Sequence, residues 1–160
     1  MLNYFHCFNL QPQFDINLAE LEKKYFALQQ EFHPDATSST SDQSAQINAA
    51  YQILSDDFLR ACHLLQLQNI NILNDELAPK PDLTTLEEIF ELQEKISEIT
   101  NKAELTTLKN YLTQEFNLEI QKFANAFASN KINESAQFLI RAKYLRKSLA
   151  DIKKLRITNS

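Results

Sequence analysis

The sequence of 160 residues contains no glycine and only four prolines. Tight hairpin turns and left-handed backbone positions favour glycine, because it has no Cβ to clash at positive φ. A sheet of short, tightly connected strands is therefore disfavoured, and the composition predicts an all-α fold. Helix ends that need a left-handed residue must then use asparagine, and Asn101 and Asn130 stand where such ends are expected.

An amphipathic helix is predicted over residues 18–32. Its apolar residues recur at intervals of three and four, which places them on one face: Leu18, Leu21, Tyr25, Leu28 and Phe32. Asn17 can cap the start of this helix, with Glu20 three residues later as in a capping box. Pro34 disfavours helical backbone angles at His33, so the helix is expected to end there.

His33, Pro34 and Asp35 form a stiff corner after this helix, because proline fixes its own φ. Neighbouring residues offer neither further metal ligands at suitable spacing nor a nucleophile with an orienting partner, which disfavours a metal site and a catalytic dyad. Two interpretations stay open from these residues alone. The tripeptide is a chance turn, or it is a recognition corner whose Asp35 carboxylate accepts hydrogen bonds from a partner's arginine.

The rest of the first half also predicts helices. Residues 2–10 form a short aromatic helix or turn, and Ser55-Asp56-Asp57 bends the chain after a longer helix. The inward residues of that longer helix and its extension are Ile47, Ala50, Tyr51, Leu54 and Phe58. Asparagines and prolines gather in residues 69–81, which therefore connect two domains, 1–75 and 76–160, with the boundary near residue 75.

The second half predicts three long helices joined by short polar links. The first begins near Thr84 or Thr85, each of which has a glutamate three residues later. Apolar steps of three and four define the second helix over about 105–127, and the third runs over about 132–156. Three such helices are expected to pack as an antiparallel bundle.

An acidic stripe marks the first of these helices. Its members step by four, three and four residues, so they share one face: Glu87, Glu91, Glu94 and Glu98. Leu86 and Phe90 lie beside them. From the residues alone this is either a solvated acidic face, as most charge stripes are, or a mixed acidic and apolar surface for a partner.

Several stretches together resemble a known family. Tyr4, Phe5 and Phe8 near the start, then Phe32-His33-Pro34-Asp35, then Ile47–Leu54 followed by Arg60-Ala61, resemble a J-domain. J-domains stimulate ATP hydrolysis by DnaK-type chaperones. Farther on, Glu91–Ile99 is similar to the scaffold-binding helix of HscB proteins, the J-type co-chaperones of iron–sulfur cluster assembly. The resemblance covers nearly the whole chain.

This resemblance implies partners and contact residues. His33, Pro34 and Asp35 would contact an HscA-type, DnaK-like chaperone ATPase, with Lys23 and Lys24 assisting. The positions that match the family's binding patch for the cluster scaffold IscU are Leu86, Phe90, Glu91, Glu94, Glu98 and, on the last helix, Tyr144. Glu87 stands where the family usually has an apolar residue. The hydrolytic chemistry belongs to the chaperone, so the chain is expected to be no enzyme and to need no cofactor or metal.

Charge separates the first domain from generic J-domains. Residues 1–75 contain Lys23, Lys24 and Arg60 against nine acidic residues, a net charge of −6. Generic J-domains resemble one another in having a more basic second helix, so a dedicated HscA-type partner is favoured over promiscuous use of DnaK. Two alternatives remain: a J-type adaptor that delivers another client to a general DnaK, and a helical interaction protein with a chance His-Pro-Asp.

The overall charge disfavours other partner classes. The whole chain has a net charge of −5, which makes a nucleic-acid partner unexpected, and no apolar run reaches the ~18 residues of a membrane helix. Cys7 and Cys62 lack a metal-ligand spacing and are typical of a reducing, cytoplasmic setting. The basic last helix, which begins its charged run at Arg141, is expected to pair with the acidic helix beside it.

Overall fold

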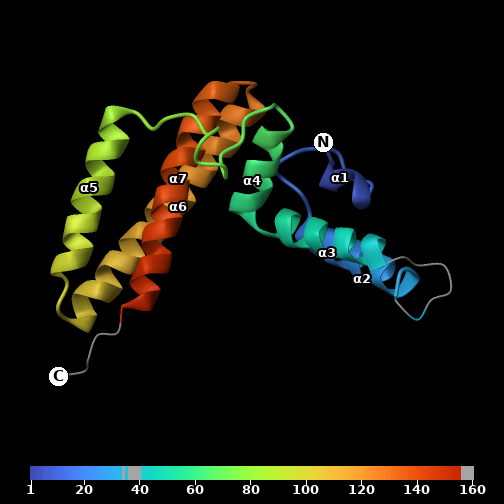
Figure 1. Cartoon of the computed structure of the whole chain (residues 1–160), viewed down its shortest axis with the longest axis horizontal. Coiled ribbons are helices and arrows are strands. Elements are labelled where there is room, and N and C mark those ends of the chain that lie inside the picture. Colours follow the sequence, from blue (N-terminus) through green and yellow to red (C-terminus); the bar gives the residue numbers. More distant parts are fainter. Residues whose placement is uncertain (34, 36–40, 156–160) are drawn as a thin grey trace. The chain divides into compact units, whose positions relative to one another are not determined.

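The computed structural model describes residues 1–33, 35 and 41–155. Within these residues it contains seven helices and no strand, which confirms the all-α prediction. The expected roles of Pro34 and of the end of the last helix at Arg156 lie outside the described residues. The chain divides into two compact units, Met1–Asn69 and Ile70–Ser160 (Figure 1). The boundary expected near residue 75 stays a prediction.

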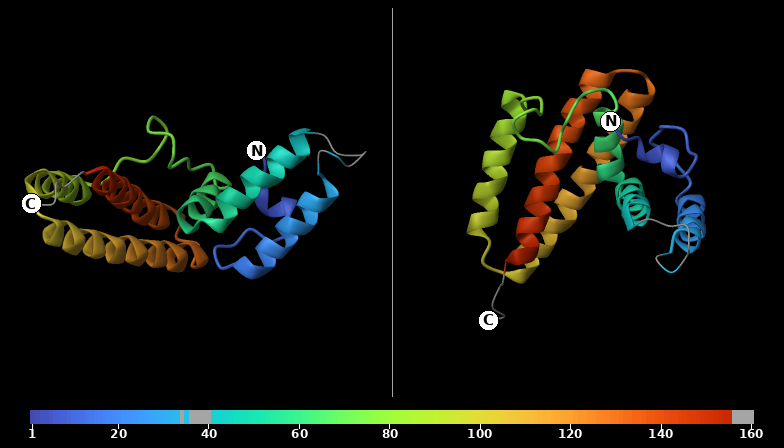
Figure 2. Two further views of the ribbon diagram at one scale, coloured as in Figure 1. Left: turned by 90° about the horizontal axis from the view of Figure 1, so that it is seen from below. Right: turned by 45° about the vertical axis from the view of Figure 1, so that its right-hand side comes forward.

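The first unit is organised around its third helix. Four helices follow one another: α1 (Tyr4–Cys7), α2 (Leu18–Glu31), α3 (Ser41–Ser55) and α4 (Asp57–Gln66). Helix α3 packs against each of the other three, and α2 and α3 lie side by side as an antiparallel hairpin (Figures 1 and 2). The residues expected to face inward on α3 and at the start of α4 are buried, except Tyr51, which is half-buried.

Local hydrogen bonds set the ends of these helices as predicted. The Asn17 side chain caps α2 by accepting from the Glu20 N–H at 3.1 Å. Helix α2 ends at Glu31, with the Phe32 N–H donating to the Leu28 carbonyl. Asp56 separates α3 from α4, because its extended backbone breaks the helix and its carboxylate caps the next one.

A buried arginine ties the segments of this unit together. Arg60 is only 4% exposed. Its guanidinium donates to the carbonyls of Phe14 and Leu54 at 2.8 and 2.7 Å and to the carboxylate of Asp57 at 2.6 Å. The same group lies 4.7 Å from the centre of the Phe14 ring. Arg60 thus joins the segment before α2, the end of α3 and the start of α4.

The second unit is the predicted three-helix bundle. It consists of α5 (Leu83–Glu98), α6 (Lys102–Ala128) and α7 (Ile132–Lys154). Helices α6 and α7 pack along one another as an antiparallel hairpin, and α5 packs against α7 (Figure 1). Leu112, Leu145 and Ile152 form a buried cluster, on which partly buried residues of α5 pack, namely Leu92 and Ile96.

Asparagine takes the left-handed positions that glycine would otherwise occupy. Asn9, Asn69 and Asn130 have φ of 52°, 63° and 58°. Asn130 closes the α6–α7 turn, as predicted: its N–H donates to the Phe127 carbonyl, and the next N–H, that of Lys131, reaches back to Ala126. Its short polar side chain tolerates this conformation better than most residues do.

Two predictions about helix termini were wrong: a left-handed helix end at Asn101 and a threonine cap for α5. Asn101 has φ of −130° and is the N-cap of α6, where its side chain accepts from the Glu104 N–H at 2.9 Å. A residue between two helices can either end the first in a left-handed conformation or cap the start of the second, and Asn101 does the latter. Thr84 and Thr85 lie inside α5, because Asp82 caps this helix by accepting from the Thr85 N–H at 2.8 Å.

His63 is buried in the first unit as a neutral imidazole. Its Nε2 accepts a hydrogen bond from the Tyr4 N–H at 3.1 Å, which places the proton of the neutral ring on Nδ1. The ring lies against those of Tyr4 and Phe5. Burial disfavours the charged form and lowers the pKa of His63 below its ordinary 6.5.

We expect this histidine to make the first unit less stable in mild acid. The unfolded chain binds a proton at His63 near pH 6.5, whereas the folded chain does so only at lower pH. The stabilisation is therefore complete above about pH 6.5 and is lost as the pH falls through the lowered pKa of the folded chain. Urea unfolding between pH 5 and 7.5 measures this loss. His63→Gln should reduce it, whereas His33→Gln, at an exposed ring, should retain it; equal pH profiles for all three chains would contradict the assignment.

The left-handed asparagine gives a second prediction. Asn130→Ala should lower the free energy of unfolding by about 1 kcal/mol, because a Cβ without a polar group is strained at positive φ. Asn130→Gly should retain the stability of the native chain. Chemical denaturation of both variants measures the difference, with Leu118→Ala on the exposed side of α6 as the control. Equal destabilisation by alanine and glycine would show that the backbone conformation is not the cause.

Candidate functional site

The first candidate site is the corner after α2. His33 and Asp35 are largely exposed, with side-chain exposures of 61% and 92%, and Pro34 between them lies outside the described residues. The Nδ1 atom of His33 lies 3.3 Å from both the Asp35 carboxylate and the Asp35 N–H. A neutral ring can accept from this N–H, and a protonated ring would donate to the carboxylate. Both polar groups stay accessible to a partner.

Contacts across the α2–α3 hairpin hold the helix that leads to this corner. The Tyr25 hydroxyl and the Gln29 amide both donate to the side-chain oxygen of Asn48 at 2.8 Å. The rings of Tyr25 and Tyr51 stack with their centres 4.0 Å apart. These contacts fix the last turns of α2 against α3, so the corner is attached to a well-packed hairpin.

Lys23 and Lys24 both lie on α2, where Lys24 is half-buried at the edge of the packed face. Lys23 is exposed, and Lys24 pairs with Glu20 at 3.0 Å. Both precede the helix end at Glu31 by seven or eight residues, or about 10–12 Å along the axis. The structure thus places them on the same helix as the corner but does not gather them around it.

The second candidate site is the outward face of α5. Leu86 and Phe90 are exposed to 37% and 69%, and Glu91, Glu94 and Glu98 are also exposed. The opposite face of the helix is half-buried. Leu83, exposed to 71%, extends the apolar stripe by one turn. The sequence interpretation missed it, although its spacing of three from Leu86 was a usable signal.

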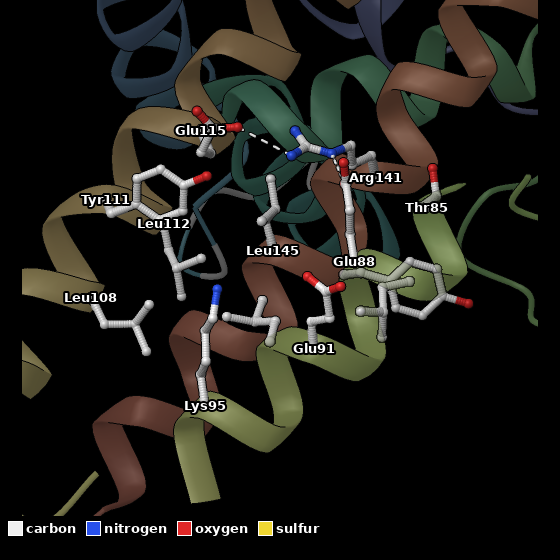
Figure 3. Close-up of a pocket in the computed structure, with 13 residues that line it drawn as sticks. Thr85, Glu88, Glu91, Lys95, Leu108, Tyr111, Leu112, Glu115, Arg141 and Leu145 are labelled. Carbon is white, nitrogen blue, oxygen red and sulfur yellow. Dashed lines mark hydrogen bonds and ion pairs between the residues drawn. The ribbon is translucent and has the colours of Figure 1, made fainter. Parts of the chain in front are cut away.

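Of the residues on α5 that are expected to bind the scaffold, only Glu91 shares a groove with Tyr144. Tyr144, half-buried on α7, and Glu91 line the same groove of about 330 Å³ between α5 and the α6–α7 pair. Figure 3 shows Glu91 and Lys95 on α5 across from Tyr111 on α6. Leu86, Phe90, Glu94 and Glu98 do not line this groove. The residues expected to bind the scaffold therefore fall into two sets. Most of them form the outer face of α5, whereas Glu91 and Tyr144 line the groove beside it.

An ionic cluster on this groove was not foreseen in its full extent. Arg141 pairs with Glu88 on α5, as expected for the basic last helix, and also with Glu115 on α6 (Figure 3). It pairs with Glu119 of α6 as well. Partial burial disfavours the charged guanidinium, but the hydrogen bonds to Glu88 and Glu115 outweigh this effect and raise the pKa of Arg141. The sequence gives little indication of these two partners, because the helix that carries Glu115 and Glu119 was predicted from its apolar pattern alone.

Lys143 departs from the expected pairing with the acidic helix. Its ammonium group donates to the Asp75 carboxylate at 2.6 Å and to the Ile72 carbonyl at 2.9 Å. This hydrogen bond and the charge of Lys143 lower the pKa of Asp75. Lys143 thus holds the segment that precedes α5 against α7.

The described residues contain no cluster of three or more histidine, cysteine or acidic side chains arranged to hold a metal ion. Among the described helices, none combines the length and the apolarity needed to cross a membrane. Cys7 and Cys62 are both free thiols.

Comparisons with known proteins agree with this two-part architecture. The DnaJ domain model matches residues 3–63, and the model of the HSCB C-terminal oligomerisation domain matches residues 81–153. A co-chaperone protein HscB homolog from Haemophilus ducreyi is 32% identical, over 97% of this chain and 96% of its own length. The chain belongs to the HscB family of J-domain co-chaperones of iron–sulfur cluster assembly.

Solved structures and a plant relative extend this assignment. The chaperone HscB from Vibrio cholerae is 30% identical, with a TM-score of 0.79 over 96% of both chains. The iron–sulfur cluster co-chaperone protein HscB homolog of Arabidopsis thaliana is 28% identical, and this chain spans 63% of its length. Membership in the HscB family implies two classes of partner, an Hsp70-type chaperone and a scaffold protein.

Proposed function

We propose that this HscB-family chain stimulates ATP hydrolysis by an HscA-type chaperone and delivers an IscU-type scaffold to it. One observation supports this most directly: each unit exposes one polar or mixed surface at the positions that match the family's motifs. These surfaces are the His33–Asp35 corner in the first unit and the outer face of α5 in the second. A chain with both surfaces can bring chaperone and scaffold together on one adaptor.

The chaperone would be engaged through His33, Pro34 and Asp35, with Lys23 and Lys24 assisting. The Asp35 carboxylate is accessible and can accept hydrogen bonds from an arginine of the chaperone. Binding at this corner would favour the chaperone conformation that is competent for hydrolysis, since a ligand shifts an equilibrium toward the state that it binds more tightly. The bond-breaking chemistry stays with the chaperone.

The scaffold would be bound by exposed apolar side chains of α5 and by the glutamates beside them. Leu86 and Phe90 are exposed apolar side chains, and burying them against the scaffold would supply affinity. Glu91, Glu94 and Glu98 would favour a basic scaffold surface and repel acidic competitors. Tyr144, which lines the same groove as Glu91, would add a contact from α7.

The setting and the choice of partner are part of this proposal. We place the chain in the cytoplasm, which two free thiols support because disulfides are rare there. The low positive charge of the first unit favours a dedicated chaperone over a general DnaK. The alternative is an adaptor that delivers another client to DnaK, in which case altering the α5 face would leave client binding unchanged.

The corner gives a direct prediction for chaperone stimulation. His33→Gln should abolish the increase in single-turnover ATP hydrolysis by the HscA-type chaperone, because the ring that orders the corner is lost. The measurement uses purified chaperone and IscU-type scaffold, with and without each chain. His6→Gln, at an exposed histidine of the first unit outside the corner, is the matched control and should retain stimulation. Equal rates with and without the native chain would exclude the co-chaperone activity itself.

The α5 face gives a prediction for scaffold binding. Phe90→Ala should weaken binding of the IscU-type scaffold about tenfold, because a central apolar anchor typically contributes more than about 1 kcal/mol. Its stability should change little, since the side chain is 69% exposed. Titration calorimetry with the scaffold measures the effect, and Leu118→Ala on α6 serves as the matched apolar control. Unchanged affinity in Phe90→Ala would contradict this assignment of the face.

A further inference from the structure

Helix α5 is attached to its unit unevenly along its length. Unlike α6 and α7, it has no fully buried residue. Its second half packs Leu92 and Ile96 on the apolar cluster of α6 and α7. The first half carries the exposed Leu83, Leu86 and Phe90, and Ile89 is its one half-buried aliphatic residue. Something other than apolar burial must hold this half.

Arg141 of α7 contacts both of the other helices of the bundle at this place. From α7 its Nε donates to Glu88 of α5 at 2.7 Å. Its Nη1 and Nη2 donate to Glu119 and Glu115 of α6 at 2.9 and 3.1 Å. Each guanidinium nitrogen thus serves a different carboxylate, a geometry that the planar fork of arginine provides and a lysine ammonium cannot reproduce. Figure 3 shows Arg141 between Glu88 and Glu115.

Partial burial makes these contacts stronger than ordinary surface pairs. Glu119 is 2% exposed, and Glu115 and Arg141 are 25% and 22% exposed. Hydrogen bonds between charged groups gain strength where water is excluded. Lys122 also pairs with Glu119, at 2.9 Å. Without Arg141, the carboxylates of Glu88, Glu115 and Glu119 would lose the cation that they share, and their mutual repulsion would disfavour the approach of α5 to α6.

We propose that Arg141 is a positioning residue for scaffold binding, which holds the first half of α5 through Glu88 and so fixes the binding face that begins at Leu86 and Phe90. This inference rests on the proposed scaffold site. Glu88 lies one turn from both Glu91 and Leu92 on the same helix. Releasing it frees the binding face while the Leu92 and Ile96 contacts keep α5 attached. Binding of the scaffold would then have to order the first half of α5, and the free energy of this ordering would reduce the affinity.

Glu88→Gln is the sharpest variant for a test. Glu88 is half exposed, at 48%, so the glutamine can be accommodated and the buried pair of Arg141 with Glu119 stays in place. Two effects are expected. Backbone amides of residues 83–91 in the free chain should exchange hydrogen faster, with those of α6 unchanged. The scaffold concentration for half-maximal stimulation of the chaperone should rise about three- to tenfold, as expected for one lost charge-assisted hydrogen bond, with the maximal rate retained.

Arg141→Lys extends the test, because it keeps the charge but loses the fork, and it should reproduce both effects. Glu134→Gln is the matched control, since it removes an exposed pair with Lys131 in the first turn of α7, two turns before Arg141, and should change neither readout. One outcome would overturn the positioning role alone. Glu88→Gln would show the hydrogen-exchange rates and the half-maximal scaffold concentration of the native chain, while Phe90→Ala would bind the scaffold more weakly. If Phe90→Ala also bound the scaffold normally, the scaffold site itself would be wrong and the inference would fall with it.

Discussion

Each unit of this chain depends on an arginine whose guanidinium serves several segments at once. Arg60 satisfies two backbone carbonyls and one carboxylate in the first unit, and Arg141 satisfies three carboxylates in the second. Buried or half-buried charge is costly unless every donor finds an acceptor. The paired geometry therefore specifies one arrangement of the surrounding helices, in addition to what apolar packing supplies.

The two units use their helices differently. In the first, α3 packs against all its neighbours, and the α2–α3 hairpin presents the His33–Asp35 corner from a firmly packed base. In the second, α6 and α7 form the packed pair, and α5 is added to it through a short apolar contact and the Arg141 cluster. Both arrangements leave the proposed contact residues on the surface, while their helices are fixed from the opposite side.

Much of this architecture is readable from the sequence, because helix patterns and caps are local. The apolar steps of three and four predicted where α6 and α7 lie in the chain, and the lack of glycine predicted a left-handed Asn130. The same reasoning erred at Asn101, since asparagine is suited both to ending one helix and to starting the next. It also preferred a threonine cap, although Asp82 stood two residues earlier and suits the position equally well.

The ionic cluster could not be predicted with its partners because it joins residues distant in sequence. Glu88, Glu119 and Arg141 come from three helices, and which acidic residue meets which basic one depends on the rotation of each helix in the bundle. Leu83, by contrast, could have been found, since its spacing continues the stripe of Leu86 and Phe90. The candidate surfaces themselves came from the family resemblance, because exposed charge and exposed apolar residues are common on any helix.

A helix that gives the core no fully buried side chain is also a helix whose sequence is little constrained by folding. Most positions of α5 face solvent, so substitutions there usually change stability by less than about 0.5 kcal/mol. Its outer face, which is the proposed scaffold site, can therefore vary along with a changing partner, while the α6–α7 pair keeps the domain folded. In evolutionary terms, the bundle separates the residues that maintain the fold from those that are free to follow a binding partner.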